Sequence, residues 1–89
     1  MIKTTITISN KLGLHARASA KLTKLAGSYP CEVWMTTGER RVNAKSIMGV
    51  MMLAAGIGSQ VELETSGERE QEAMDALLAL IQDKFGEGQ

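Results

Sequence analysis

Stretches in which apolar and polar residues alternate with a period of two constrain the fold of this chain most strongly. Residues 2–8 alternate in this way and are rich in β-branched side chains, and residues 60–65 set valine and leucine against glutamates. Successive side chains of a strand point to opposite faces, so both stretches predict strands with one apolar face. Residues 31–36 and 40–43 flank a tight turn at 37–39 and predict a hairpin of two more strands.

Three other segments have the spacing of helices. Residues 16–26 carry apolar side chains at helical intervals and are followed by Gly27, which favours a helix end. Residues 46–53 are too apolar for a loop and predict a short helix. A closing helix is predicted from about residue 68 to residue 84, with Gly86 as its end. The apolar positions that predict it are Met74, Leu77, Leu78, Ile81 and Phe85.

The predicted order of elements is therefore βαββαβα. Because the strands have one polar face, only the other face needs cover. The fold class that follows is α+β, an open-faced β-sandwich with a four-stranded antiparallel sheet and three helices on one face. The 89 residues leave room for one domain, residues 1–89, with one small core.

Composition limits the cellular compartment in which the protein is expected. Cys31 is the only cysteine, so no intramolecular disulfide forms, and we expect it to be a small buried strand residue. The chain starts without an apolar signal core, and no stretch approaches the ~20 apolar residues that span a bilayer. We therefore expect a cytoplasmic protein that does not insert into membranes.

The net charge of zero hides an uneven distribution. Residues 1–60 contain eight Lys and Arg against only Glu32 and Glu39, whereas residues 61–89 contain eight acidic residues against Arg69 and Lys84. The basic residues form no run and have no aromatic residues between them, so nucleic acid is not an expected partner. A modest basic face fits an acidic protein partner better, because it raises the rate of encounter without tight binding.

The only histidine, His15, stands two residues from Arg17, where a turn passes into the first predicted helix. Histidine is the side chain that can act as nucleophile and leaving group near neutral pH. A phosphoryl group on His15 would meet the free amides of the first helical turn and the guanidinium of Arg17. The alternative from these residues alone is a histidine that merely caps a helix. A single His and a single Cys are too few for a metal site, and no cofactor is expected.

Two motifs resemble those of the HPr family of histidine-containing phosphocarriers of the phosphoenolpyruvate-dependent phosphotransferase system. Residues 10–17 read Asn-Lys-Leu-Gly-Leu-His-Ala-Arg, and residues 43–51 read Asn-Ala-Lys-Ser-Ile-Met-Gly-Val-Met. The resemblance implies that His15 accepts a phosphoryl group on Nδ1 from enzyme I and passes it to enzyme IIA proteins of sugar permeases. It implies a carrier with a transient phosphohistidine, not an enzyme, with Arg17 as counter-charge. Such a carrier must not hydrolyse its phosphoramidate, which argues against carboxylates near the ring; Glu32 and Glu39 are the nearest acids in sequence.

The resemblance also makes Ser46 a regulatory position, phosphorylated from ATP by a dedicated kinase in lineages that have one. A serine before an apolar helix is equally expected to cap it, and both roles are compatible. We expect the partner surface to include Ala20, Lys24, Ile47, Met48 and Met51, because flexible methionines suit a carrier that meets several partners. A monomer is expected.

The chain departs from the family pattern at Ala18, where proline is usual. Alanine is an excellent helix former, so we expect the chemistry to survive with a more mobile turn. Other functions stay open. They are a regulatory carrier of the nitrogen-related branch, which feeds no sugar, and a small α+β domain that binds a ligand or a metal. The Lys45-Ser46 pair does not make an ATP-binding loop, because Ala44 stands where such a loop has glycine.

Overall fold

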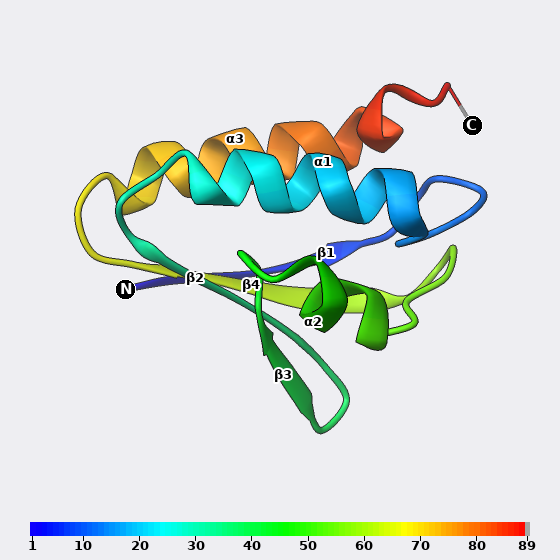
Figure 1. The fold of residues 1–89 in the computed structure, drawn as a ribbon, viewed down its shortest axis with the longest axis horizontal. Helices are drawn as coiled ribbons and strands as arrows, with labels where there is room; N and C mark the ends of the chain where they lie inside the picture. The colour runs from blue at the N-terminus through cyan, green and yellow to red at the C-terminus, as the bar shows by residue number, and fades with distance from the viewer. Residues whose placement is uncertain (89) are drawn as a thin grey trace.

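The computed structural model of the chain describes residues 1–88 and shows the order βαββαβα, followed by one short 3-10 turn (Figure 1). The strands are β1 (Ile2–Thr7), β2 (Glu32–Thr37), β3 (Arg40–Asn43) and β4 (Gln60–Ser66). The helices are α1 (Ala16–Gly27), α2 (Ile47–Met52) and α3 (Glu70–Gln82), and the 3-10 turn is η1 (Lys84–Gly86). The predicted order and the α+β open-faced sandwich are confirmed.

The four strands form one antiparallel sheet in the order β1-β4-β2-β3. The register pairs Ile6 with Val61 and pairs Met35 with both Leu63 and Val42, so apolar side chains lie side by side on one face. In Figure 1, α1 and α3 run across this face. The period-two alternation of the sequence therefore becomes a continuous apolar surface only when the strands pair in this register.

The core lies between this apolar face and the helices. Leu22 of α1, Leu77 and Ile81 of α3, and Met35 of β2 are all fully buried. Burial of each such side chain contributes about 1.5–3 kcal/mol relative to leaving it in water. The buried apolar side chains of α1 and α3 therefore account for the packing of these helices on the sheet.

Within residues 1–88, α1 and α3 leave the other face of the sheet uncovered (Figure 1). Arg41 of β3 places its guanidinium 4.0 Å from the ring centroid of Trp34 on β2 and 3.3 Å from a carboxylate oxygen of Glu64 on β4. The polar residues of the alternating strands thus cover this face with stacked and charged side chains. The predicted polar face is confirmed.

The predicted closing helix, from about residue 68 to residue 84, is two residues too long at each end. Arg69 has a left-handed backbone with φ of 63°, so α3 begins at Glu70. The helix ends at Gln82, because Lys84 and Phe85 are also left-handed, with φ of 54° and 55°. Phe85 is fully buried, as predicted, but it reaches the core through a reversal of the chain and not through a further helical turn.

The other boundaries agree with the prediction to within one residue, a difference that is usual for helix and strand ends. Cys31 is buried, as expected, but it lies directly before β2 and not within it. No helix among residues 1–88 has the length and the apolar composition to cross a membrane.

Candidate functional site

His15 is the residue directly before α1 and occupies its N-cap position, with an extended backbone (φ −75°, ψ 178°). Its carbonyl oxygen accepts the first helical hydrogen bond, from the amide of Ser19 at 2.8 Å. Its side chain makes no capping hydrogen bond and is 27% exposed. The ring is therefore not used to cap the helix. The first turn of α1 contains no acidic residue, so the helix itself does not compensate the partial positive charge that its amides present beside His15.

The turn before His15 rests on the loop that follows α2. The amide of Leu14 donates to the carbonyl oxygen of Ala55 at 2.9 Å, and Gly13 has φ of +65°. A Cβ at Gly13 would lie 2.5 Å from the oxygen of Ala55 and 2.7 Å from Cα of Gly56. Only glycine meets both conditions, the left-handed backbone and the close approach. These contacts fix where the chain enters α1 and therefore where His15 stands.

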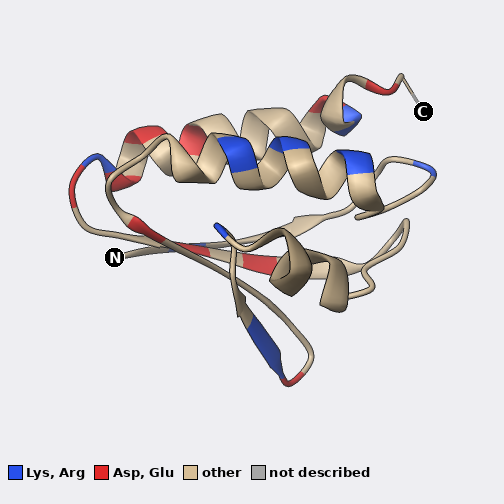
Figure 2. Cartoon of the chain, in the orientation of Figure 1, with Lys and Arg blue, Asp and Glu red and all other residues tan. Residues whose placement is uncertain are grey.

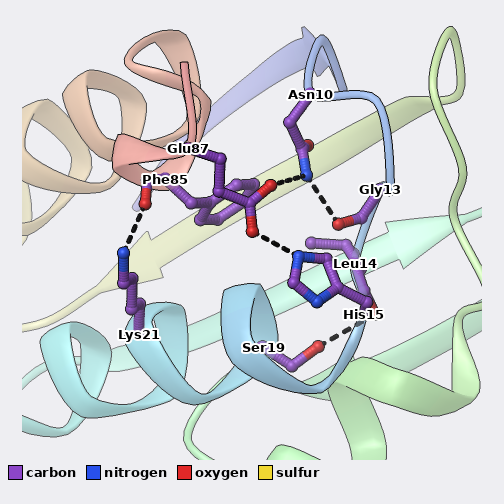
Figure 3. A network of polar contacts seen from close by, with 8 residues as sticks. All are labelled: Asn10, Gly13, Leu14, His15, Ser19, Lys21, Phe85 and Glu87. Carbon is purple, nitrogen blue, oxygen red and sulfur yellow. Dashed lines mark hydrogen bonds and ion pairs between the residues drawn. The ribbon is translucent and has the colours of Figure 1, made fainter. Parts of the chain in front are cut away.

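The C-terminal segment brings a carboxylate onto the ring (Figure 3). Nε2 of His15 forms a hydrogen bond with one carboxylate oxygen of Glu87, and the other oxygen accepts from Nδ2 of Asn10 at 3.0 Å. Asn10 is fully buried and also donates to the carbonyl oxygen of Gly13 at 2.8 Å. Asn10 therefore joins the turn before His15 to the end of the chain.

The expectation that no carboxylate lies near the ring is therefore wrong. The glutamates nearest in sequence do not supply it; Glu87, 72 positions away along the chain, does. Its two oxygens are engaged by the ring and by an amide, and its side chain is only 14% exposed. A carboxylate held in this way is not free to activate a water molecule, which removes the original objection to an acid at this place.

The environment favours the ionised form of Glu87. The hydrogen bond from Asn10 holds the pKa of the Glu87 carboxyl below its usual range, and the hydrogen bond and charge of His15 and the charge of Lys21 act in the same direction, against the opposing effect of partial burial. Near neutral pH the group that faces the ring is therefore a carboxylate.

The ring opens into a surface hollow lined by Lys11, Leu12, Ala16, Arg17 and Gly86, together with His15 and Glu87. Lys11 and Arg17 are the cations of this hollow, and Arg17 is exposed. The structure thus brings His15 and Arg17 to one place, as the sequence predicts. A guanidinium and an ammonium beside helix amides form an environment suited to a phosphoryl group.

The exposed face of α1 continues from this hollow. Arg17, Ala20, Lys21 and Lys24 follow at helical spacing and are all exposed. Figure 2 shows these basic residues in a row along α1, whereas acidic residues gather around the beginning of α3. The basic and acidic residues, which are separated along the sequence, are therefore also separated on the surface, with a basic face around His15.

Helix α2 packs next to α1 and exposes an apolar surface. Ile47, Met48 and Met51 are 39%, 66% and 39% exposed, whereas Val50 is fully buried. Met52, which the sequence did not single out, is also more than half exposed. The predicted partner surface on α2 is therefore accessible, and it adjoins the basic face of α1.

Ser46 is the N-cap of α2, as predicted, and its hydroxyl oxygen accepts from the amide of Gly49 at 3.1 Å. The residue is exposed. Ala18, at the position where the family has proline, is the third residue of α1 and is fully buried. Among residues 1–88, no three side chains of the His, Cys, Asp and Glu types come together as a metal-binding group.

Sequence reasoning missed two residues of this site, Asn10 and Glu87. Asn10 opens the motif at residues 10–17, but nothing in that motif indicates a role for its side chain, and no periodicity marks Glu87, which stands between two glycines after the last helix. The one signal for Glu87 is that glycine on both sides allows a sharp reversal of the chain. That signal does not say where the reversal leads.

Comparison with known proteins gives consistent matches over almost the whole chain. The family model described as "PTS HPr component phosphorylation site" matches residues 2–83. The phosphocarrier protein HPr of Cupriavidus necator is 68% identical over 89 residues, which are 100% of both chains. The crystal structure of HPr-C-His from Thermoanaerobacter tengcongensis has a TM-score of 0.95 and 45% identity and covers 98% of each chain. A crystal structure of an HPr dimer from that organism has a TM-score of 0.79 and 45% identity, over 98% of this chain and 100% of the other.

Proposed function

This chain belongs to the HPr family, the phosphocarriers of the phosphotransferase system, and from this premise we propose that His15 carries the phosphoryl group. In the proposed relay, phosphorylated enzyme I charges His15, and the phosphoryl group then passes to enzyme IIA proteins of sugar permeases. The protein acts as a carrier with a transient phosphohistidine. It is not itself an enzyme.

The observation that carries this proposal is the position of His15 at the start of a 12-residue helix, inside a hollow that two cations line. A phosphoryl group on the ring would lie near the first amides of α1 and near Arg17 and Lys11. These groups stabilise negative charge without activating water. We assign Arg17 as the principal counter-charge, because a guanidinium can donate two parallel hydrogen bonds to phosphate oxygens.

Partners bind, in this proposal, across the basic face of α1 and the apolar face of α2. Ala20 and Lys24 contribute from α1, and Ile47, Met48 and Met51 contribute from α2. An apolar centre next to exposed cations suits an acidic partner that buries the methionines and meets the charges at the rim. Enzyme I and enzyme IIA proteins would use the same surface in turn.

We assign Ser46 a regulatory role at the edge of this surface. It caps α2 and directly precedes the exposed Ile47 and Met48, so a phosphate on its hydroxyl would add about −1.5 to −2 charge there. Added negative charge would repel an acidic partner and hydrate an apolar contact. A serine kinase that acts on Ser46, where the cell has one, would therefore slow the relay.

The whole chain is proposed to act as one carrier domain in the cytoplasm and as a monomer. The test of the monomer is light scattering, which should give a mass near the 9.6 kDa of one chain. A mass about twice that value would contradict it.

The relay is tested with phosphoenolpyruvate and enzyme I. Wild-type protein should gain one acid-labile phosphate per chain, and His15→Ala should gain none while remaining folded by circular dichroism. Arg17→Ala should be charged more slowly, whereas Lys3→Ala, which removes an equal charge from the polar face of the sheet, should be charged at the wild-type rate. Phosphate that persists on His15→Ala would refute the assignment of the carrier residue.

A further inference from the structure

Residues 84–87, which follow α3, hold the contact between Glu87 and His15 in place. Phe85 is fully buried, and its carbonyl oxygen accepts from Nζ of Lys21 on α1 at 2.6 Å. Lys84, Phe85 and Gly86 all have positive φ values, of 54°, 55° and 75°, so the chain reverses and returns toward the start of α1. Figure 3 shows this segment above the ring, with Lys21 and Asn10 on either side of it. The burial of Phe85, the hydrogen bond from Lys21 and the reversal of the chain therefore hold the carboxylate of Glu87 at His15.

The contact determines which ring nitrogen is free. An ionised carboxylate only accepts hydrogen bonds, so Nε2 of His15 must carry the proton. A neutral imidazole has one protonated nitrogen, which leaves the lone pair on Nδ1. No hydrogen bond to Nδ1 is found in the part of the chain that the structure describes, and Figure 3 shows this nitrogen on the side of the ring away from Glu87.

We propose that Glu87 is a positioning residue for the phosphoryl acceptor, which fixes the Nε2-protonated form of His15 and presents Nδ1 as the nucleophile. This inference rests on the proposed function of His15 and adds a residue that lies beyond residues 2–83, the part of the chain that the family model matches. Asn10 has a supporting role, because it holds the second oxygen of the carboxylate.

Phosphoryl transfer to Nδ1 needs no added proton donor or acceptor. The lone pair of Nδ1 attacks the phosphorus of the phosphorylated donor, an N–P bond forms, and the bond between phosphorus and the donor breaks with its electron pair leaving on the donor. His15 keeps its proton on Nε2, so the phosphorylated ring becomes a cation. The carboxylate of Glu87 then faces that cation and stabilises it, as the orienting carboxylate does for the imidazolium of a catalytic triad. In the reverse sense, the protonated ring is the better leaving group when the phosphoryl group is passed on.

The first test measures the ring in the unphosphorylated protein, so it does not depend on the relay. Long-range ¹H–¹⁵N spectra at about pH 8.5, above the usual titration range of histidine, should show a slowly exchanging Nε2–H resonance of His15 in the wild type. Glu87→Ala should lose that resonance to exchange with water, and Glu87→Gln should keep it in part, because an amide oxygen still accepts. Asp83→Asn is the matched control, since it removes one exposed negative charge from the same end of the molecule, and its spectrum should match the wild type.

The second test measures charging by enzyme I at varied carrier concentration. Glu87→Gln and Glu87→Ala should lower the maximal rate by about tenfold or more, with the alanine variant the slower, and should leave the half-saturating concentration unchanged. Asp83→Asn should change neither value. A role in docking would instead raise the half-saturating concentration.

The outcomes separate this inference from the proposed function. If the wild type accepts no phosphate on His15, the proposed function fails, and the spectra still report whether Glu87 fixes the ring. If the wild type is charged normally and Glu87→Ala keeps both the Nε2–H resonance and the maximal rate, Glu87 only anchors the C-terminal segment and the inference is overturned. A faster maximal rate in Glu87→Ala would also overturn it, since the carboxylate would then obstruct the ring.

Discussion

Replacing Gly13 by alanine tests whether the turn before His15 is held by a close approach of backbone to backbone. Gly13 has φ of +65°, and an added Cβ would lie 2.5 Å from the carbonyl oxygen of Ala55 and 2.7 Å from Cα of Gly56. Both neighbours are backbone atoms, which cannot move aside as the end of a flexible side chain can. One of the two loops must therefore shift.

The expected cost has two parts. A left-handed backbone costs a residue with a Cβ about 1–2 kcal/mol relative to glycine. Forcing an extra carbon into a filled space costs about 1–3 kcal/mol more. A gain of about 0.5 kcal/mol comes from the smaller conformational freedom of alanine in the unfolded chain. Gly13→Ala should therefore lower the free energy of unfolding by about 1.5–4.5 kcal/mol, a large part of the stability of a small protein.

Alanine variants of two other glycines measure the backbone cost apart from the steric cost. Gly38 has φ of +59° with nothing within 4 Å of an added Cβ, so Gly38→Ala should cost about 1 kcal/mol from the backbone alone. Gly27 has no positive φ and equally open space at the end of α1, so Gly27→Ala should be neutral or raise stability by up to about 1 kcal/mol. Urea unfolding, with extrapolation of the free energy to water, measures all three variants.

The functional consequence should follow the structural one. A shifted turn moves the carbonyl oxygen of Gly13 away from Asn10, which also holds Glu87, so Gly13→Ala should weaken the Nε2–H resonance of His15 and slow its charging. Gly38→Ala should change neither. The reasoning is refuted if Gly13→Ala costs no more than Gly38→Ala, because the close approach to Ala55 and Gly56 would then have no energetic effect.

Three further variants test other parts of the structure. Ser46→Asp should keep or slightly raise the thermal midpoint, because aspartate also caps a helix, yet should weaken association with enzyme I measured by calorimetry; wild-type affinity would leave Ser46 as a cap alone. Ala18→Pro should raise the free energy of unfolding by no more than about 1 kcal/mol with charging retained, because an amide in the first turn of α1 has no helical partner to lose; strong destabilisation would contradict this. A hydrogen bond from the amide of Gly67 lowers the pKa of Glu70 in the folded state. The contribution of the Glu70 carboxylate to stability is therefore present above about pH 4.5 and is lost as the pH falls through the folded pKa. Glu70→Gln should therefore lose less stability than the wild type between pH 5 and pH 3, and an equal loss in urea unfolding would show that Glu70 does not contribute.

The sequence by itself determined the features that depend on neighbours along the chain. The alternation in β1 and β4 assigned one face of each strand to the core, and the register of the sheet agrees, with Ile6 beside Val61. Helical spacing located α1 and the buried stripe of α3, and the serine before an apolar run located the cap of α2. The pairing of His15 with Arg17 at a helix start is also local, because both residues belong to one turn. Such patterns join residues that are close in the sequence, so the sequence shows them directly.

The tertiary structure alone decided how the ends of the chain meet. Glu87 and His15 are 72 positions apart, and Glu87 and Asn10 are 77 positions apart, so no local pattern relates them. Their contact depends on Phe85, whose burial competes with continuing α3 as a helix. The burial of Phe85 and the hydrogen bond from Lys21 to its carbonyl oxygen both favour the reversal, in which two left-handed residues follow Gln82. The carboxylate that faces the histidine is therefore placed by the packing of the core.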